Sequence, residues 1–377
     1  MTQLIYADNA ATTKLDIDAF EAMKPYLLEY YGNASQPYLF SQSVKTALKR
    51  SRQKIAACIN AEPEEIYFTS GGTESDNWAI KGSAFSDTSL KYTITSQIEH
   101  HAILNACAAI EKLQYPVVYL RVSKNGVITP TELKAQINQK TRIVSVMLAN
   151  NEIGVIQPVK ELCSIAHAHG AIFHTDAVQA LGHVIVNVRE LEVDMLSASA
   201  HKFNGPKGIG FLFIRKGTTI MPYIDGGAQE HGLRAGTENI ASIVGMAVAL
   251  QKNCEEIEAN TMHLEELDAI IIKTLCKSGI DYRRNGSCNR VPGNISLSFK
   301  NIDGEALLHR LDLMGICVST GSACDTVNTQ ISHVLHAIGL PIGYAQGTIR
   351  ITLGKENTKE EAEAIAKAIL RVILYRA

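Results

Sequence analysis

The sequence lacks three features that would set it apart from ordinary water-soluble enzymes. It has no apolar run near the roughly 18 residues that span a bilayer, so we expect no membrane association. Its 36 basic and 38 acidic side chains give a net charge of −2, and we therefore expect no direct nucleic-acid partner. The N-terminus lacks the basic and apolar regions of a secretory signal, which predicts a cytoplasmic protein.

The eight cysteines form neither a Cys-x-x-Cys pair nor a zinc-like quartet, which predicts free thiols and no metal site. Cys288, beside polar residues and a glycine, is predicted to be exposed. Most of the others lie in helical or strand patterns, where a thiol usually acts as a small apolar side chain. These expected core fillers are Cys58, Cys107, Cys163, Cys254, Cys276 and Cys317.

Short β-branched runs alternate with amphipathic stretches between residues 60 and 215. The alternation predicts a mostly parallel sheet with helices on both faces, hence an α/β fold. Helical spacing of apolar residues marks 103–113 and 159–169. The expected strands are 66–69, 91–95, 117–121, 143–148, 171–174, 194–197 and 209–214.

The pattern changes after residue 240, where two long helical stretches precede a mixture of strands and helices. We expect strands near 293–299 and 316–319, and helices at 331–338 and 360–374. A chain of 377 residues predicts about two domains. We place a large domain at residues 14–258 and a smaller α+β domain at residues 1–13 and 259–377.

Two residues at predicted strand ends point to a cofactor. Lys202 follows an apolar run, where desolvation lowers the pKa of an amine and frees it to condense with a carbonyl. Asp176 ends another strand, where a buried carboxylate needs a cation such as a protonated pyridine nitrogen. Together they match pyridoxal 5'-phosphate, and a structural Asp–Lys ion pair is the alternative.

A third feature, Thr69-Ser-Gly-Gly-Thr-Glu, follows a predicted strand and opens a helix. Its paired glycines let a ligand approach the backbone, and the hydroxyl of Thr73 lies beside amide groups at a helix N-terminus, which favours an anion. An ordinary capped turn is the alternative.

Eight motifs are spread over essentially the whole chain. They are Thr69-Ser-Gly-Gly-Thr-Glu, Ile98-Glu-His-His, Asn150-Asn-Glu-Ile-Gly, His174-Thr-Asp-Ala-Val-Gln, Ser199-Ala-His-Lys, Arg234-Ala-Gly-Thr-Glu-Asn, Ser319-Thr-Gly-Ser-Ala-Cys and Ile349-Arg-Ile-Thr-Leu-Gly. In this order they closely resemble the cysteine desulfurases of the NifS/IscS type, pyridoxal-phosphate enzymes of aminotransferase class V. The resemblance implies transferase fold type I and a homodimer with shared active sites.

The resemblance also implies a role for each matching residue. Lys202 would carry the cofactor as a Schiff base, His100 would stack on its ring, and Asp176 would pair with the pyridine nitrogen. Arg350 would bind the substrate carboxylate, and Cys324 would accept the sulfur. The other implied contacts are Gly72, Thr73, Gln179, Ser199, His201 and, in the neighbouring subunit's site, Thr237 for the cofactor, Asn33 for the substrate, and Asn151 for both.

For Arg350 and Cys324 the residues alone also support an interpretation. Arg350 lies on an apolar strand pattern and needs an anion, either a ligand carboxylate or a structural partner. Cys324 lies among small and polar residues, as in an exposed loop where a thiolate can attack. The family usually has a small hydroxyl residue after this cysteine and a histidine near position 38, whereas this chain has Asp325 and Tyr38. The carboxylate of Asp325 disfavours the thiolate, which puts the rate and the choice of acceptor in doubt.

The implied activity converts L-cysteine to L-alanine and leaves a persulfide on Cys324, for delivery to a sulfur-acceptor protein. Iron–sulfur cluster assembly and thio-cofactor, tRNA or DNA sulfur pathways would all begin in this way. One alternative is a selenocysteine lyase or another class V reaction on the same cofactor. A different class of alternative is a non-catalytic scaffold of a sulfur pathway.

Overall fold

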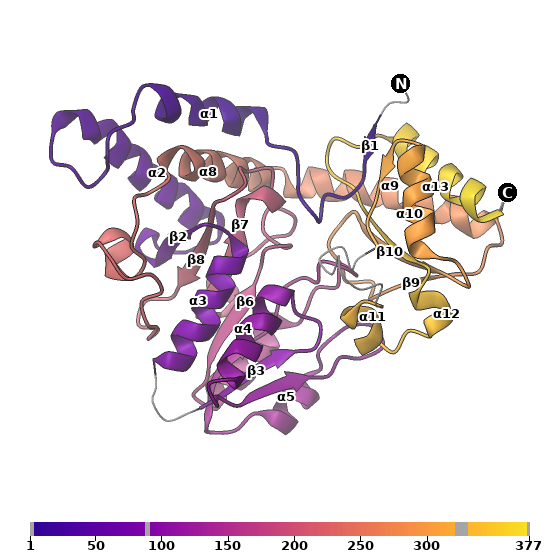
Figure 1. Ribbon diagram of the computed structural model, residues 1–377, viewed down its shortest axis with the longest axis horizontal. Helices are drawn as coiled ribbons and strands as arrows, with labels where there is room; N and C mark the ends of the chain where they lie inside the picture. Colours follow the sequence, from indigo (N-terminus) through magenta and orange to yellow (C-terminus); the bar gives the residue numbers. More distant parts are fainter. Residues whose placement is uncertain (1–3, 87–90, 321–330, 375–377) are drawn as a thin grey trace.

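The computed structural model describes residues 4–86, 91–320 and 331–374. A seven-stranded sheet forms the centre of the larger part of the molecule (Figure 1). Within this sheet β8 runs against its two neighbours and the other strands are parallel to one another. In spatial order the strands are β2 (Ile66–Thr69), β8 (Gly210–Ile214), β7 (Met195–Ser199), β6 (Ile172–Asp176), β5 (Thr141–Ser145), β3 (Tyr92–Ser96) and β4 (Val117–Leu120). The predicted mostly parallel α/β sheet is confirmed.

Helices cover both faces of this sheet because successive strand residues point to opposite sides. Met195 packs toward α3 (Gly72–Phe85) and α4 (His101–Glu111), in a cluster that also holds Trp78. Leu196, the next residue, lies in the core of the other face. The helices of that second face are α2 (Gln42–Cys58), α5 (Pro130–Gln136), α6 (Val159–Ala168), α7 (Val188–Leu191) and α8 (Ile240–Glu255).

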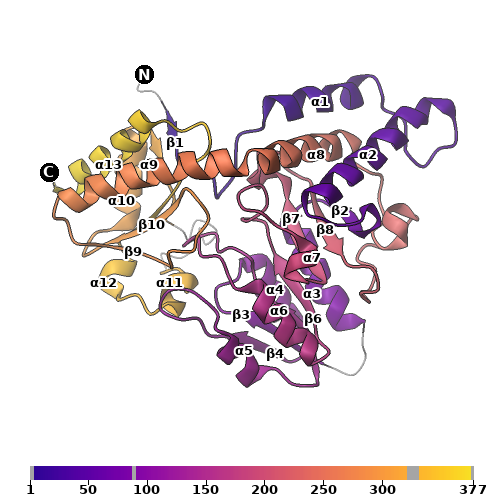
Figure 2. The same ribbon diagram turned by 180° about the vertical axis from the view of Figure 1, so that it is seen from behind.

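A smaller antiparallel sheet has its own apolar core, in which Leu267, Ile295, Ile349 and Ile365 are fully buried. Its strands are β12 (Thr348–Thr352), β10 (Asn294–Phe299) and β9 (Tyr282–Arg284), in that order. The helices around it are α9 (Ile257–Lys277), α10 (Gly304–Leu313), α12 (Ile342–Ala345) and α13 (Lys359–Leu374), while α11 (His333–Ala337) packs against Ile98 and Ile153 of the larger part. Figure 2 shows α8 leading into α9, which carries the chain from the large sheet to the small one.

The N-terminal segment connects the two parts a second time. Strand β1 (Ile5–Tyr6) pairs in parallel with β11 (Ile316–Cys317), and Asp8 bridges to Thr352. The chain then crosses to the large part, where α1 (Ile17–Leu28) packs along α8 (Figure 1). Residues 8–13 therefore lie between the small sheet and the end of β7, next to the predicted cofactor lysine.

Most strand predictions are confirmed to within two residues at each end, and strand 66–69 matches β2. The largest error is the strand predicted over 143–148, because β5 ends at Ser145. The strand predicted over 316–319 ends early too, since Ser319 leaves β1 and pairs its backbone with Arg350. No helix in the described parts of the chain combines the length and apolar character needed to cross a bilayer.

Candidate functional site

Lys202 and Asp176 lie at the carboxyl ends of neighbouring parallel strands, the edge where open α/β sheets bind ligands. Asp176 is the last residue of β6 and is 4% exposed. Burial raises its pKa to about 6, while a hydrogen bond from Val178 N and the charge of Lys202 oppose the rise. The Asp176 carboxylate is thus ionised at neutral pH and is stabilised by the positive charge of Lys202. These two predicted residues are brought together.

The amine of Lys202 is held by the N-terminal segment. Its Nζ atom donates to the backbone oxygens of Ala10 and Ala11 at 2.6 and 2.7 Å. Gln179 donates its side-chain amide to the same Ala10 oxygen at 3.0 Å. Lys202 ends a short 3₁₀ turn, Ala200–Lys202, that follows β7, so its side chain starts from a rigid strand end. The crossing segment therefore fixes both the amine and the predicted Gln179.

The predicted anion site is a cavity of about 380 Å³ at the N-terminus of α3. A Cβ atom on Gly71 would lie 3.5 Å from Ser199 Oγ, and one on Gly72 would lie 2.7 Å from Val178 Cγ2. Glycine at both positions keeps the backbone amides of this 14-residue helix open toward the cavity. The lining residues are Thr12, Ser70, Gly71, Gly72, Thr73, Glu74, Ser199, His201, Lys207 and Gly208. The predicted Gly72, Thr73, Ser199 and His201 thus share one cavity.

Two histidines beside this site are uncharged at neutral pH. Burial, followed by the charge of Lys202, lowers the pKa of His100 to about 4. The same two causes lower the pKa of His201 to about 4, and the His201 ring contacts Thr12 Oγ1 at 3.1 Å. His100 caps α4 by accepting the backbone N–H of Ala102 at Nδ1, which leaves the ring proton on Nε2. A neutral imidazole in a fixed orientation suits stacking on an aromatic ring.

A buried acidic network beneath Asp176 was not predicted from the sequence. Asp76 of α3 is 1% exposed, and burial, then the charge of Asp176, raises its pKa well above the usual range. His174 lies 3.8 Å from Asp76 Oδ1 and is neutral because burial lowers its pKa to about 3. Burial raises the pKa of Glu99 to about 8, so this side chain holds a proton at neutral pH. Glu99 belongs to the motif Ile98-Glu-His-His, but a sequence motif does not show whether a side chain is buried.

Arg350 is buried in β12 and has an acidic partner within the chain. From the sequence, such a structural partner was the alternative to a ligand carboxylate. Its Nη2 atom donates to Asp8 Oδ1 at 2.7 Å, and its Nη1 atom donates to the backbone oxygen of Asn151 at 3.1 Å. Its Nε atom is buried without a hydrogen-bond partner. A guanidinium has five N–H donors, so Nε–H and the second Nη2 proton remain for one carboxylate. The structure brings Arg350 next to Asn151, the other residue predicted to bind the substrate carboxylate, and the contact with Asp8 was not predicted.

Cys324 lies outside the described residues, as does Asp325. The chain on each side of residues 321–330 is fixed near the site. Before it, Ser319 exchanges two backbone hydrogen bonds with Arg350. After it, Ser332 donates to Glu152 Oε2 at 2.5 Å, and the His333 ring contacts the Glu99 backbone oxygen at 3.0 Å. His333 also packs edge-on against His101, a residue without an expected role.

Two predicted site residues are not brought to Lys202 within one chain. Thr237 is exposed beside a separate small cavity, which it shares with Ser70 and Arg234. Asn33 lies in the loop between α1 and α2, where its side chain accepts the backbone N–H of Ser35. Figures 1 and 2 place this loop at the edge of the molecule farthest from the small sheet that carries Arg350.

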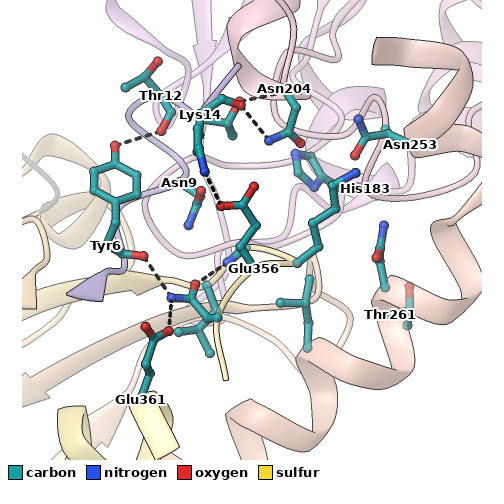
Figure 3. Close-up of a pocket in the computed structure, with 18 of the residues that line it drawn as sticks. Tyr6, Asn9, Thr12, Lys14, His183, Asn204, Asn253, Thr261, Glu356 and Glu361 are labelled. Carbon is teal, nitrogen blue, oxygen red and sulfur yellow. Dashed lines mark hydrogen bonds and ion pairs between the residues drawn. The ribbon is translucent and has the colours of Figure 1, made fainter. Parts of the chain in front are cut away.

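A different cavity of about 400 Å³ lies along the N-terminal segment, between the two sheets (Figure 3). Several of its polar side chains already have partners: Lys14 pairs with Glu356 at 3.3 Å, and Tyr6 donates to the Thr12 backbone oxygen at 2.8 Å. Neither Lys202 nor Asp176 is among its lining residues. We assign this cavity no part in the chemistry.

Seven cysteines lie in the described residues and all are free. Cys107 and Cys163 are buried and Cys288 is exposed, as predicted. Cys276 is exposed on α9, so its prediction as a core filler is wrong, because helical spacing does not say which face of a helix a residue occupies. Among the described residues no cluster of three or more His, Cys, Asp or Glu is arranged to hold a metal ion.

Comparison with known proteins gives one consistent result. The family model "Aminotransferase class-V" matches residues 5–365. The chain is 48% identical to cysteine desulfurase IscS of Dictyoglomus turgidum over 99% of this chain and 95% of that protein. It is 45% identical to cysteine desulfurase IscS of Methanosarcina thermophila over 98% of this chain and 92% of that protein.

Solved structures agree with these sequence matches. A NifS-like protein superposes with a TM-score of 0.93 at 37% identity, covering 99% of this chain and 100% of that one. SspA in complex with cysteine superposes with a TM-score of 0.84 at 34% identity, covering 94% and 100%. The chain therefore belongs to the cysteine desulfurases of the class V aminotransferase family.

Proposed function

We propose that this protein is a pyridoxal 5'-phosphate-dependent enzyme that converts L-cysteine to L-alanine and transfers the sulfur to Cys324 as a persulfide. The observation that carries the proposal is the meeting of the Lys202 amine, the buried Asp176 carboxylate and the α3 anion cavity at one sheet edge. A structural Asp–Lys pair alone would not require that cavity. The relatives' printed names point to the same activity.

The residues fit the cofactor group by group. The phosphate carries negative charge and suits the helix N-terminus and the hydroxyls of Thr73 and Ser199. The pyridine nitrogen suits the ionised Asp176, and the ring face suits the neutral His100. The aldehyde suits the amine of Lys202. Glycine at position 72 leaves the space that a Cβ atom would take.

The chain's own groups then perform three tasks. When bound, the cofactor withdraws electrons from the substrate, which acidifies the Cα proton and weakens the C–S bond. Lys202 leaves the Ala10 and Ala11 oxygens and removes the Cα proton with Nζ. Arg350 holds the substrate carboxylate with Nε and Nη2, while Asp8 and the Asn151 backbone fix the guanidinium plane.

Sulfur transfer needs no outside oxidant. The Cys324 thiolate attacks the substrate sulfur, an S–S bond forms and the substrate C–S bond breaks. The bonding electron pair stays with the carbon skeleton, which takes up a proton and leaves as L-alanine. The fixed flanks at Ser319 and Ser332, next to Arg350 and Glu152, support Cys324 as this nucleophile because they start and end its segment beside the substrate residues.

The proposed assembly is a homodimer with shared active sites. Exposed Thr237 and partly exposed Asn33, which the single chain leaves away from Lys202, would then serve the partner's site. Apolar side chains gather on α1 and the loop that follows it, a surface suited to a second copy of the chain. They are Ile17, Phe20, Leu27, Leu28, Tyr30, Tyr31, Leu39 and Phe40.

We further propose that residues 14–258 act as the cofactor-binding domain and that residues 1–13 with 259–377 act as the domain carrying Arg350 and Cys324. The separate apolar cores around the two sheets support this division. The persulfide would pass to a sulfur-acceptor protein, and the reaction would take place in the cytoplasm.

The test combines absorption and mass spectrometry on the purified protein. Pyridoxal 5'-phosphate should give the wild type a visible absorption band, and Lys202→Ala should remove it. After incubation with L-cysteine, the Cys324 peptide should carry one added sulfur atom and L-alanine should appear. Cys324→Ser should keep the absorption band and lose persulfide and sulfide release, whereas the matched variant Cys276→Ser should retain both. Wild-type sulfide release by Cys324→Ser would overturn the nucleophile assignment.

A further inference from the structure

Arg234 lies in one of the eight motifs, three residues before Thr237, and the proposed function gives it no role. Its side chain forms an ion pair with Glu74, in which Nε and Nη2 donate to Oε1 and Oε2 at 2.8 and 3.1 Å. The arginine side chain is 20% exposed and the glutamate side chain 10%. A two-point, largely buried pair of this kind holds both side chains in one geometry, unlike a solvated surface pair.

Glu74 places a negative charge at the cavity proposed for the cofactor phosphate. It lies in the first turn of α3 and lines that cavity together with Thr73 and Ser199. Its Oε2 atom also accepts the backbone N–H of Ser70 at 2.7 Å. Burial acts to raise the pKa of Glu74, but the hydrogen bonds from Arg234 and Ser70 lower it overall, so the carboxyl is ionised. A carboxylate beside a phosphate is repulsive unless a cation neutralises it, and Arg234 supplies that cation.

The same arginine fixes the loop that ends at Thr237. This loop, residues 229–237, is fastened at one point by Glu230, whose buried carboxylate accepts hydrogen bonds from Arg52 Nη1 and Nη2 at 2.8 and 2.7 Å. Arg234 adds an attachment to α3 only three residues before Thr237. Thr237 itself is exposed, so the two ion pairs hold it at the surface in a defined position.

We propose that Arg234 is a positioning residue for both active sites of the dimer. In its own chain it neutralises Glu74 and so makes the α3 cavity more favourable for the cofactor phosphate. Through the loop it holds Thr237 in place for the phosphate bound in the partner's site. One ion pair thus contributes to cofactor binding at two sites. The inference rests on the proposed cofactor and on the proposed shared active sites, and its tests measure cofactor affinity instead of turnover.

The first experiment titrates pyridoxal 5'-phosphate into the cofactor-free full chain and follows the visible band. Arg234→Gln should lower the affinity by about 10-fold or more, because it leaves a largely buried carboxylate unpaired beside the phosphate. Adding Glu74→Gln to this variant should recover part of the loss, since the repulsive charge is gone while the loop stays loose. The matched control is Arg189→Gln, which breaks another pair with a buried carboxylate, Glu65, away from both cavities. This control should bind the cofactor as wild type does.

Hybrid dimers separate the two sites. A Lys202→Ala chain gives no visible band, so the band reports only the site of the other chain. When that other chain carries Arg234→Gln, its site should be weak, and Glu74→Gln in the same chain should restore it because the partner's loop is intact. When the Lys202→Ala chain carries Arg234→Gln instead, the visible site should lose affinity several-fold, because the partner's Thr237 is then poorly held.

Arg234→Lys distinguishes charge from geometry, since lysine keeps the charge but lacks the two-point contact. In the hybrids it should spare the site of its own chain and weaken only the partner's site. Wild-type affinity in either Arg234→Gln hybrid would overturn the proposal that one arginine serves both sites. Failure of Glu74→Gln to restore the first hybrid would overturn the charge argument. A wild-type protein that gives no band with pyridoxal 5'-phosphate would overturn the proposed function, and this inference with it.

Discussion

Arg350 and Asp8, which lie 342 positions apart, form a partly buried ion pair with Nη2 and Oδ1 separated by 2.7 Å. Asp8 and the Asn151 backbone oxygen each accept one hydrogen bond, from Nη2 and Nη1 of Arg350 respectively. The Nε–H and the second Nη2 proton therefore remain for a ligand. Asp8 therefore orients the guanidinium of Arg350 and leaves this side of it open to a ligand. The structural pair is thus compatible with the proposed role of Arg350 as a carboxylate-binding residue.

Arg350→Lys tests this arrangement. Lysine keeps the charge but has no planar fork, so the variant should lose the paired hydrogen bonds to the substrate carboxylate. We expect kcat/KM for L-cysteine to fall by about 10- to 100-fold, mainly through KM, as for the loss of a charged hydrogen bond. The visible band of the bound cofactor should be unchanged.

The matched control is Arg284→Lys, which alters another arginine–carboxylate pair, with Asp268, away from the proposed site. This control should leave KM unchanged. An unchanged KM in Arg350→Lys would show that the substrate carboxylate binds elsewhere.

Glu99 gives a prediction about pH. Its pKa is raised to about 8 by burial, above an ordinary value of 4.5. Between these values the folded protein holds a proton that the unfolded chain releases, so this group's contribution to stability is complete below pH 4.5 and is lost as the pH rises through 8. Glu99→Gln removes the titration. The free energy of unfolding of wild type minus that of Glu99→Gln should fall by about 1.4 kcal/mol per pH unit between pH 5 and 7.5.

Urea unfolding of both proteins across this pH range measures the difference. A slope of zero would show that Glu99 is ionised in the folded state. A lowered pKa would likewise give no slope in this range, because the side chain would then be ionised in both the folded and the unfolded state. Glu132, whose pKa is lowered chiefly by the hydrogen bond from Arg121, provides a control group, since Glu132→Gln should give no such loss at higher pH.

The site residues that were predictable share a local signature. Lys202, Asp176 and Thr73 each follow an apolar strand pattern, and the carboxyl ends of parallel strands meet at one edge. Contacts between residues far apart in the sequence could not be predicted. The pairing of Asp8 with Arg350 is set by packing between distant segments, which leaves no periodicity along the chain. The early end of β5 was also hidden, because residues 146–148 are as apolar as the strand before them.

Ser332 fixes the chain that leaves the predicted sulfur-acceptor segment. Both Ser332 and its partner Glu152 are buried, and the hydrogen bond between them is 2.5 Å long. Ser332→Ala should loosen this end of the segment and slow persulfide formation on Cys324 by about 10-fold, because small losses of positioning are costly in a transfer step. Cofactor absorbance and the binding of L-cysteine should be unchanged. Rapid-mixing mass spectrometry of the Cys324 peptide measures the rate.

Ser287→Ala is the control for this prediction, since Ser287 is only partly buried and its hydroxyl forms hydrogen bonds with the backbone of Asn289, two residues away. It should form the persulfide at the wild-type rate. A Ser332→Ala rate equal to that of wild type would show that the Ser332–Glu152 contact does not position the acceptor.

Thr237 tests the shared active site. Thr237→Val should weaken pyridoxal 5'-phosphate binding about 10-fold through loss of a hydrogen bond to a charged phosphate. A hybrid dimer of one Lys202→Ala chain and one Thr237→Val chain shows whether Thr237 serves the partner's site or the site of its own chain. If Thr237 serves the partner, the site with an intact Lys202 also receives an intact Thr237 and should bind the cofactor with wild-type affinity. If Thr237 serves its own chain, that site should show the weakened affinity.

Gly72 tests the anion cavity through a steric contact. A Cβ atom at position 72 would lie 2.7 Å from Val178 Cγ2, closer than carbon atoms can approach. Val178 in turn donates its backbone N–H to Asp176 at 2.9 Å, so the clash pushes on the residue that holds the carboxylate. Gly72→Ala should therefore weaken cofactor binding by about 10-fold or more, in line with the usual cost of overpacking. Fluorescence or absorbance titration with pyridoxal 5'-phosphate measures the affinity.

The double variant Gly72→Ala/Val178→Ala separates this steric cause from a loss of backbone flexibility. Removing the Val178 methyl groups relieves the clash, so the double variant should recover most of the lost affinity, while Val178→Ala alone should bind nearly as wild type. If the double variant remains as weak as Gly72→Ala, the effect comes from the glycine backbone or from the amide groups at the start of α3. Recovery in the double variant would therefore assign the effect to the space that glycine leaves beside Val178 and Ser199.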